Sequence, residues 1–254
     1  MKDIGLVLSG GGARGVAHIG VIQALEEYGV KVTRISGTSA GSIVGSLYAM
    51  GLPPAELLKI ISQVSIFNAL RPTLAPGGLL RMDGFRELLQ KFLPDDFSKL
   101  KKPMTIAATE LKLGDIVYFD SGELVPAVLA SCSIPGVFSP LPYKGALYVD
   151  GGILDNLPAK PLYKKCDYLI GSHCNKVSLS FDVTNMRLVI ERSLLLAIGA
   201  NTTHSKNMCD MVIEPPGLDK FSAFDIGKAK EIFDLGYKFT KENFKQTNFD
   251  KILG

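Results

Sequence analysis

Apolar and polar residues along the first half of the chain follow the pattern of buried strands that alternate with amphipathic helices. The run DIGLVLS at 3–9 is almost continuously apolar, which is typical of a parallel strand covered on both faces. Over 13–30 the apolar positions instead recur close to helical spacing, at Val16, Ile19, Ile22 and Leu25. This pattern predicts a first strand and then a helix that Gly29 ends.

The same alternation continues to the end of the chain. Strands are predicted at 32–37, 103–111, 114–122, 146–153, 167–172 and 209–215, and helices at 39–52, 54–64, 125–135, 186–207 and 229–247. The strand at 114–122 alternates like the hairpin partner of the strand before it. No repeat, linker or low-complexity segment interrupts this order. We therefore expect one domain over 1–254, with a layered α/β architecture.

Residues 66–100 interrupt the regular pattern. The segment mixes leucines with Pro and Gly and then returns to a short amphipathic helix. One interpretation is a mobile lid, or a loop that touches a membrane and admits an apolar substrate. The other is a packed excursion that covers the sheet edge. The sequence leaves both open.

Composition narrows the class of protein further. Hydrophobic residues make up 46% of the chain and charged residues 21%, so a buried core is feasible and broad disorder is not expected. A net charge of +3 is too small to indicate nucleic-acid binding, although it suits an anionic membrane surface. The chain begins directly in a strand and has no apolar run of the ~18 residues that span a bilayer. The expected location is the cytoplasm, with peripheral contact at a membrane.

The four cysteines fit a reducing compartment better than a disulfide framework. No C-x-x-C pattern occurs, and in a chain of this size we expect free and mostly buried thiols, at Cys132, Cys166, Cys174 and Cys209. A group of Cys166, His173 and Cys174 matches no zinc-binding spacing. No metal and no cofactor are therefore expected.

A glycine-rich stretch follows the first predicted strand. Gly10, Gly12 and Gly15 satisfy G-x-G-x-x-G, the spacing that cradles the pyrophosphate of a dinucleotide. The next strand should then end in an acidic residue that holds the ribose, but here it ends in SGTSAGS. No G-K-[ST] follows the glycines either, which argues against a P-loop. A nucleotide-binding module is thereby disfavoured, and the same loop can instead cradle another anion.

The second strand–helix junction contains G-x-S-x-G, from Gly37 to Gly41. This pattern between a strand and a helix predicts a nucleophile elbow, a tight turn that lifts the hydroxyl of Ser39 clear of the sheet edge. The helix that begins at Ala40 places partial positive charge beneath that hydroxyl. The sequence therefore indicates a serine nucleophile.

Both junctions should lie at the carboxyl edge of one parallel sheet, where ligands of such sheets bind. Backbone amides of the glycine loop, from Gly10 to Gly12, can then face Ser39 and stabilise the oxyanion of a tetrahedral intermediate. Arg14 in the same loop either adds positive charge or braces the backbone. The anion that this loop cradles would be a transient one.

The nucleophile needs a base, and the chain offers two kinds. Of its three histidines, His18 lies within a predicted helix and His204 is not at a strand end, which leaves His173 as the candidate for a Ser–Asp–His triad. The alternative is a carboxylate acting directly. Asp150 stands at a strand end before two glycines, although Asp-Gly is also a common hairpin turn. Asp155 is a second carboxylate in the same loop and has less room around it.

Taken together, these segments resemble the patatin-like phospholipase family. The resemblance rests on GGGARG at 10–15, GTSAG at 37–41 and DGG at 150–152, supported by ASCSIPGVFSP at 130–140 and by Asn156-Leu157-Pro158. It extends over nearly the whole chain and implies a three-layer α/β/α sandwich with a mostly parallel central sheet. By motif position it implies a catalytic dyad of Ser39 and Asp150, with no role for His173. It also implies an oxyanion hole of Gly10, Gly11 and Gly12 and the supporting residues Arg14, Gly15, Gly37, Ala40, Gly41, Gly151 and Gly152.

The activity implied by the resemblance is hydrolysis of acyl esters of phospholipids or lysophospholipids, without metal, through an acyl-serine intermediate. A general carboxylesterase or thioesterase would use the same residues. A regulatory scaffold that keeps the fold but turns over little substrate is the alternative outside enzymes. Head group, chain length and oligomeric state are not encoded in these motifs.

Overall fold

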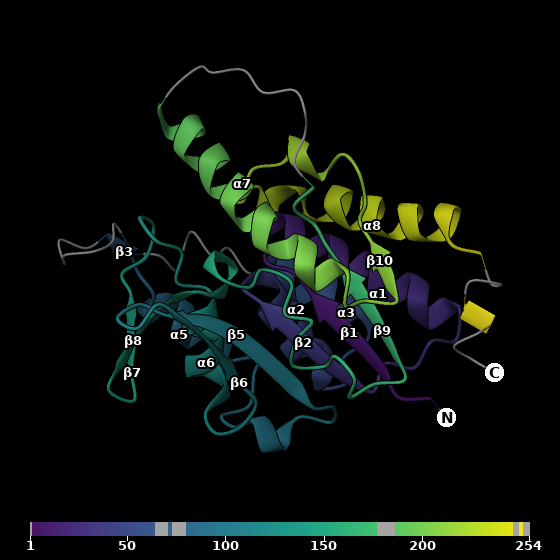
Figure 1. The fold of residues 1–254 in the computed structure, drawn as a ribbon, viewed down its shortest axis with the longest axis horizontal. Helices are drawn as coiled ribbons and strands as arrows, with labels where there is room; N and C mark the ends of the chain where they lie inside the picture. Colours follow the sequence, from purple (N-terminus) through teal and green to yellow (C-terminus); the bar gives the residue numbers. More distant parts are fainter. Residues whose placement is uncertain (1, 64–70, 73–79, 177–185, 246–248, 251–254) are drawn as a thin grey trace.

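A mixed β-sheet runs through the middle of the protein (Figure 1). The computed structural model describes residues 2–63, 71–72, 80–176, 186–245 and 249–250. Within these ranges, eight strands form one sheet in the order β10-β9-β1-β2-β5-β8-β7, and β6 pairs with β5 beside this path. The strands are β1 (Ile4–Leu8), β2 (Arg34–Thr38), β5 (Met104–Glu110), β6 (Asp115–Phe119), β7 (Leu141–Tyr143), β8 (Ala146–Asp150), β9 (Tyr168–Ser172) and β10 (Met211–Ile213).

The sheet is parallel on one side and antiparallel on the other. Strands β10, β9, β1, β2 and β5 pair in parallel, whereas β6, β7 and β8 add antiparallel pairs. All five residues of β1 are buried, as its continuous apolar run predicts for a strand covered on both faces. The expected mostly parallel sheet and the expected hairpin of β5 and β6 are confirmed.

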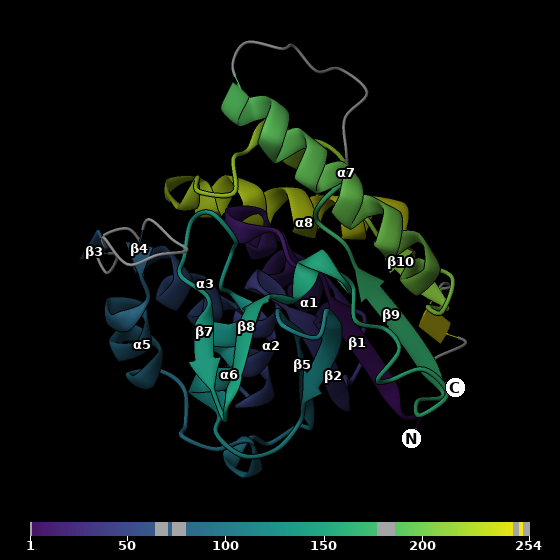
Figure 2. The ribbon, with the colours of Figure 1, turned by 60° about the vertical axis from the view of Figure 1, so that its left-hand side comes forward.

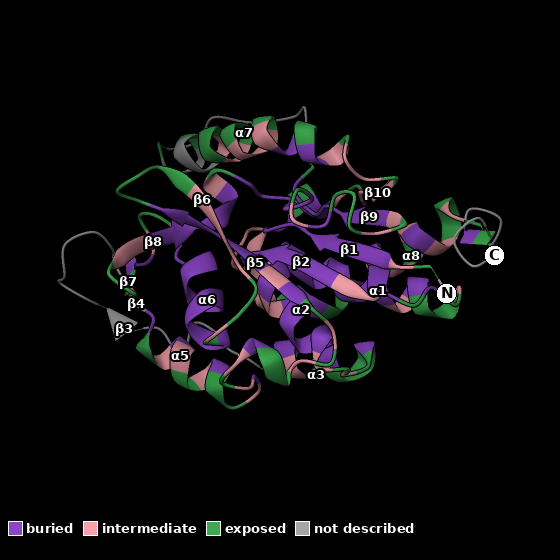
Figure 3. Cartoon of the chain, turned by 60° about the horizontal axis from the view of Figure 1, so that its bottom comes forward, coloured by how far each residue is buried: buried purple, intermediate pink, exposed green. Residues whose placement is uncertain are grey.

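Helices cover both faces of the sheet, which gives three layers. Figure 3 shows α2, α3 and α6 on one side of the sheet and α7 on the other. Helix α8 packs along α1, and α5 lies beside α6 (Figure 2). The helix bounds are α1 (Ala17–Glu27), α2 (Ala40–Ala49), α3 (Pro54–Gln63), α5 (Asp83–Gln90), α6 (Leu124–Ser131), α7 (Met186–Lys206) and α8 (Ala229–Asn243).

Two predicted segments differ in detail from the structure. The helix expected from residue 13 begins at Ala17, after a 3-10 turn at Gly12–Val16 in which the N–H of Ala13 donates to the carbonyl of Ala223, 2.7 Å away. This long-range contact tightens the turn and is invisible to periodicity. Of the segment 66–100, residues 66–70 and 73–79 lie outside the described residues, so the expected lid remains an expectation. The described part holds the short pair β3 (Arg71–Pro72) and β4 (Leu80–Arg81), followed by α5.

Strand β5 is where the functional residues are brought together. Its first half pairs with β2, so that Thr38 lies opposite Ala107. Its second half pairs with β8, so that Asp150 lies opposite Ala108. Strand β6 pairs with the opposite edge of β5, from Ile106 to Glu110. Strands β2 and β8 therefore share the remaining edge of β5 and run toward each other. Their ends therefore meet one residue apart along β5, a step of ~3.3 Å.

Candidate active site

The meeting of β2 and β8 places Ser39 beside Asp150. Ser39 follows the last residue of β2, Asp150 is the last residue of β8, and the hydroxyl of Ser39 lies close enough to the carboxylate of Asp150 to lower its pKa. Both residues are almost fully buried, with 6% and 8% of their surface exposed. The structure thus brings together the two residues that the motifs nominate as nucleophile and base.

Ser39 sits in a strained turn. Its backbone has φ 51° and ψ −122°, a conformation that a residue with a side chain rarely adopts and that costs ~1–3 kcal/mol. Its N–H donates to Oγ of Ser131 over 2.7 Å, and its carbonyl accepts from Oγ of Ser42 over 2.6 Å. These two hydroxyl groups hold the elbow from both sides. Strain of this kind keeps a nucleophile exposed to its substrate.

The glycines that flank the elbow allow its close approach to the sheet. A Cβ at Gly41 would lie 2.3 Å from the carbonyl oxygen of Leu8, and a Cβ at Gly37 would lie 2.5 Å from the carbonyl oxygen of Gly41. No side chain fits at either distance. Helix α2 can therefore begin directly against β1, with its N-terminus at Ser39.

The carboxylate of Asp150 is held in place by its own turn. Its Oδ1 accepts from the N–H of Gly152 over 2.8 Å. Burial raises the pKa of Asp150 to about 6, even though its hydrogen bonds with Ser39 and Gly152 favour the charged form. A carboxylate with a raised pKa is a stronger base than an exposed aspartate, which is the property required for taking a proton from a serine.

The glycine loop passes directly by the nucleophile. A Cβ built at Gly10 would lie 3.2 Å from Cβ of Ser39. The N–H of Gly10 is already used, because it donates to the carbonyl of Asn156 over 3.1 Å. Among the described residues, no hydrogen bond from the N–H of Gly11 or Gly12 to the protein is found. Of the three nominated amides, Gly11 and Gly12 are thus the two left for a substrate oxyanion.

Arg14 acts on the same loop. Its side chain is buried, and its Nε donates to the carbonyl of Gly11 over 3.3 Å. This contact supports the second role considered for Arg14, in which its side chain braces the backbone of the loop. Gly15, one residue on, packs against Ala40 at the start of α2, where a Cβ would lie 2.5 Å from Cβ of Ala40.

The other candidate bases have different partners. Asp155 accepts from the hydroxyl of Tyr118 over 2.6 Å and from the hydroxyl of Ser205 over 3.2 Å. His173 is buried, and its Nδ1 lies 2.6 Å from the carboxylate of Glu214. Burial lowers the pKa of His173, and the bond to Glu214 opposes this shift. Among the described residues, neither side chain forms a hydrogen bond with Ser39.

The remaining histidines and the cysteines show neither a second base beside Ser39 nor a disulfide among the described residues. His18 is fully buried and bridges the hydroxyl of Ser172 and the carbonyl of Ser9, as expected for a core histidine. His204 lies on α7. The four cysteines are free, and within the described ranges no three side chains of His, Cys, Asp or Glu are grouped as a metal ion would require.

An apolar cavity of about 110 Å³ opens beside Ser39. Its walls come from the glycine loop, α2, α3, α5 and the segment after α6, and include Val44, Leu47, Ile61, Phe85 and Leu89. Nearly all of these side chains are hydrocarbon, so the space suits an alkyl chain rather than a polar group. Helix α5, which the sequence placed in an irregular region, forms one wall.

The motifs assign no role to several residues that support this site. Ser131 ends an otherwise apolar helix, and Asn175 follows β9 at the same edge of the sheet as the two loops. A polar residue at the carboxyl end of a predicted parallel strand was a usable signal for Asn175. Ser131 carried no such signal, because its contact depends on how α6 packs against α2.

Comparison with known proteins identifies the family. A sequence profile of the family described as patatin-like phospholipase matches residues 6–163, a range that includes Ser39, Asp150 and the glycine loop. An uncharacterised NTE family protein of Mycobacterium bovis is 41% identical over 162 residues, 63% of this chain and 45% of that protein. A lysophospholipase NTE1 of Meyerozyma guilliermondii is 28% identical over 96% of this chain and 19% of that protein.

A solved structure shares the fold. The crystal structure of VipD from Legionella pneumophila has a TM-score of 0.55 at 16% identity, over 95% of this chain and 66% of that one. This chain spans less than half the length of the curated relatives named above. The profile match nevertheless covers well over half of this chain and its three motifs. The chain belongs to the patatin-like phospholipase family.

Proposed function

We propose that the protein is a serine hydrolase that cleaves carboxylic ester bonds of lipids, with phospholipids or lysophospholipids as substrates. The observation that carries this proposal is the close approach of Ser39 and Asp150, at the facing ends of β2 and β8, beside an apolar cavity. The pair supplies a nucleophile and a base, and the cavity supplies room for an acyl chain. A relative that is named a lysophospholipase supports the same substrate class.

The first half of the reaction is acylation of the serine. Oγ of Ser39 attacks the ester carbonyl carbon while Asp150 takes the hydroxyl proton. The amides of Gly11 and Gly12 donate to the oxyanion of the tetrahedral intermediate. When the intermediate collapses, the bond to the alcohol breaks, and the leaving alcohol takes the proton from Asp150. The acyl group stays on Ser39.

Water completes the cycle. It attacks the acyl carbon while Asp150 takes one of its protons, and the second tetrahedral intermediate is stabilised by the same amides. Collapse releases the fatty acid and returns the proton to Oγ of Ser39. Every proton passes through Asp150, so a pKa raised to about 6 brings the base closer to working pH than the ordinary value of 3.8.

The first experiment combines labelling with turnover. Wild-type protein is treated with a fluorophosphonate and, in parallel, given p-nitrophenyl esters of short and long acyl chains. We expect Ser39→Ala to lose both signals and Asp150→Asn to lose at least 10³-fold in kcat. Ser46→Ala, a buried serine of α2 whose hydroxyl has no partner, is the control and should retain both. A wild-type protein that neither labels nor turns over would contradict the proposal and favour a scaffold.

The same assay separates the alternative mechanisms. If His173→Gln abolished labelling while Asp150→Asn retained most of its activity, the base would be His173. Comparing matched oxygen and thiol esters separates an esterase from a thioesterase. A preference for long acyl chains would support a lipid substrate, because a general carboxylesterase gains little from filling the cavity.

We also propose that the protein works at a lipid surface. Exposed apolar side chains lie on α7 at Leu194 and Leu196, and α7 touches the turn of Asp150 through Asn201, which donates to the carbonyls of Gly152 and Ile153. No helix in the described ranges is long and apolar enough to cross a bilayer. Sedimentation with anionic vesicles tests this contact. Leu194→Ser/Leu196→Ser should reduce binding and leave hydrolysis of p-nitrophenyl acetate unchanged.

A further inference from the structure

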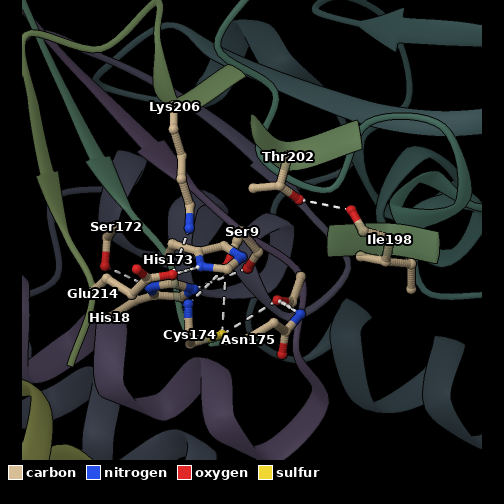
Figure 4. Close-up of polar contacts among 11 residues, drawn as sticks. Ser9, His18, Ser172, His173, Cys174, Asn175, Ile198, Thr202, Lys206 and Glu214 are labelled. Atoms are coloured by element: carbon tan, nitrogen blue, oxygen red, sulfur yellow. Dashed lines mark hydrogen bonds and ion pairs between the residues drawn. The ribbon is translucent and has the colours of Figure 1, made fainter. Parts of the chain in front are cut away.

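Three successive carbonyl groups of the glycine loop are held by buried side chains. The carbonyl of Ser9 accepts from Nε2 of His18 over 2.9 Å, and that of Gly11 accepts from Nε of Arg14 over 3.3 Å. Between them, the carbonyl of Gly10 accepts from Nδ2 of Asn175 over 2.7 Å. Figure 4 shows Asn175 and Cys174 beside the loop, in the same cluster as His18 and Ser9.

These contacts fix the direction of the backbone amides. In a planar trans peptide, the carbonyl of one residue and the N–H of the next point in opposite directions. Holding the carbonyl of Gly10 on the Asn175 side therefore aims the N–H of Gly11 to the other side. The carbonyl hydrogen bond also polarises that peptide unit and strengthens its N–H as a donor.

The packing around Gly11 reinforces this orientation. A Cβ at Gly11 would lie 2.4 Å from Sγ of Cys174 and 2.9 Å from Oδ1 of Asn175. These two residues, which follow β9, therefore leave no room for a side chain on their side of the loop. Sγ of Cys174 also lies 3.2 Å from the carbonyl of Gly10, but a thiol is a weak donor. The amide nitrogen of Asn175 is the strong partner of this carbonyl.

Asn175 is itself on a firmly anchored segment. The N–H of Cys174 donates to Oγ of Ser9 over 3.1 Å, and the N–H of His173 donates to the carbonyl of Ile213 over 2.9 Å. The side chain of His173 then pairs with Glu214, which in turn pairs with Lys206 at 2.5 Å. The buried histidine, hydrogen-bonded to Glu214, thereby has a structural explanation: it fixes the end of β9, from which Asn175 reaches the loop.

We propose that Asn175 is a positioning residue of the oxyanion hole, which holds the Gly10–Gly11 peptide so that the N–H of Gly11 faces the substrate. This inference rests on the proposed serine hydrolase function. Asn175 lies outside residues 6–163, the part that the family profile matches. The residue acts through the backbone of Gly10 and does not itself touch the substrate.

The kinetic test compares an ester with its thionoester, in which sulfur replaces the carbonyl oxygen and accepts hydrogen bonds poorly. Asn175→Ala should lower kcat on p-nitrophenyl esters by ~10–100-fold, with KM changed less than about threefold. The ratio of ester to thionoester turnover should fall by ~10-fold, because only the ester exploits the oxyanion amides. Cys174→Ala should show a smaller change in the same direction.

A matched control separates positioning from stability. Thr240 is also fully buried and donates from its side chain to a backbone carbonyl, that of Gly236, over 2.8 Å on α8. Thr240→Val should reduce stability without changing the ester-to-thionoester ratio. An Asn175→Ala variant with an unchanged ratio would overturn the proposal while leaving the hydrolase function intact.

A spectroscopic arm tests the geometry even if the protein hydrolyses no ester. With glycine labelled by ¹³C at the carbonyl and by ¹⁵N, an HNCO spectrum contains only Gly–Gly pairs, which end at Gly11, Gly12, Gly78 and Gly152. Asn175→Ala should shift the peak that joins the carbonyl of Gly10 to the N–H of Gly11 and leave the Gly152 peak in place. An unmoved Gly11 peak would overturn the proposal, and failure of wild-type turnover alone would count only against the hydrolase function.

Discussion

The backbone N–H of Ser39 donates to the hydroxyl of Ser131, a residue 92 positions away, over 2.7 Å. This contact joins the end of α6 to the turn between β2 and α2, the turn that carries the proposed nucleophile. It occupies a donor that would otherwise be buried without a partner, in a residue whose backbone is already strained. The conformation of the elbow thus depends on a helix that contains neither the proposed nucleophile nor the proposed base.

The first prediction concerns this contact. Ser131→Ala should lower the free energy of unfolding by ~1–3 kcal/mol, because the N–H of Ser39 loses its partner in a buried position. The same change should reduce kcat, since the elbow can relax toward a less strained turn. Chemical denaturation and ester kinetics measure the two effects. Ser46→Ala, which removes a buried hydroxyl without a partner, should change neither by much, and equal losses in both variants would contradict this role.

The second prediction concerns the pH dependence of catalysis. Asp150 acts as a base only when ionised, and its pKa is raised to about 6. The kcat/KM for a substrate that does not titrate, such as a p-nitrophenyl ester, should therefore rise with pH and level off above about pH 7. A profile that is flat down to pH 4.5 would mean that Asp150 has an ordinary pKa or is not the base.

The third prediction concerns stability, and its sign follows from the same shift. Between the ordinary pKa of 3.8 and about 6, the unfolded chain ionises Asp150 while the folded protein keeps it protonated. The contribution of Asp150 to the free energy of unfolding is therefore fully present below about pH 3.8. It falls by about 3 kcal/mol in total as the pH rises through about 6. Asp150→Asn should remove this loss, so the variant should be more stable than wild type at pH 8 and show no such gain at pH 4. Thermal unfolding at the two pH values measures the difference.

Much of the fold was accessible from the sequence because its signals are local. The continuous apolar run of β1 predicts a buried parallel strand, and the glycines around Ser39 predict a tight strand–helix turn. Parallel neighbours then place the loops after β1 and β2 at one edge. The motifs thus suffice to nominate Ser39 and Asp150, which the structure places at the facing ends of β2 and β8.

The rest depends on contacts between residues far apart in the chain. The hairpin pattern around Asp150 does not reveal that β8 meets β2 end to end on β5. The N–H of Gly10 looks equivalent to its neighbours in the sequence, but the carbonyl of Asn156 takes it. In the sequence alone, His173 is a candidate base. Its hydrogen bond with Glu214, 41 residues further along the chain, shows instead that it anchors the end of β9.

The fourth prediction tests the close packing of the glycine loop. Gly11→Ala would place a methyl group 2.4 Å from Sγ of Cys174, so the loop must move away from the end of β9. We expect at least a 100-fold loss in kcat, because the N–H of Gly11 would no longer face the oxyanion. Gly199→Ala on α7 is the control: nothing lies within 4 Å of the added Cβ, and the change should stabilise the helix by ~0.5–1 kcal/mol and leave activity intact. Full activity in Gly11→Ala would exclude this amide from the oxyanion hole.

The last prediction tests the cavity as the site of the acyl chain. Val44 lies one turn beyond Ala40 on α2 and lines the cavity beside Ser39, so Val44→Phe should shorten the space without touching the dyad. Because each buried methylene contributes ~0.8 kcal/mol, excluding three of them should lower kcat/KM for a dodecanoyl ester by ~50-fold. Hydrolysis of the acetyl ester should change less than about threefold. Val44→Ala, which enlarges the same space, should leave the long-chain preference in place. Equal losses on both esters in Val44→Phe would mean that the acyl chain lies elsewhere.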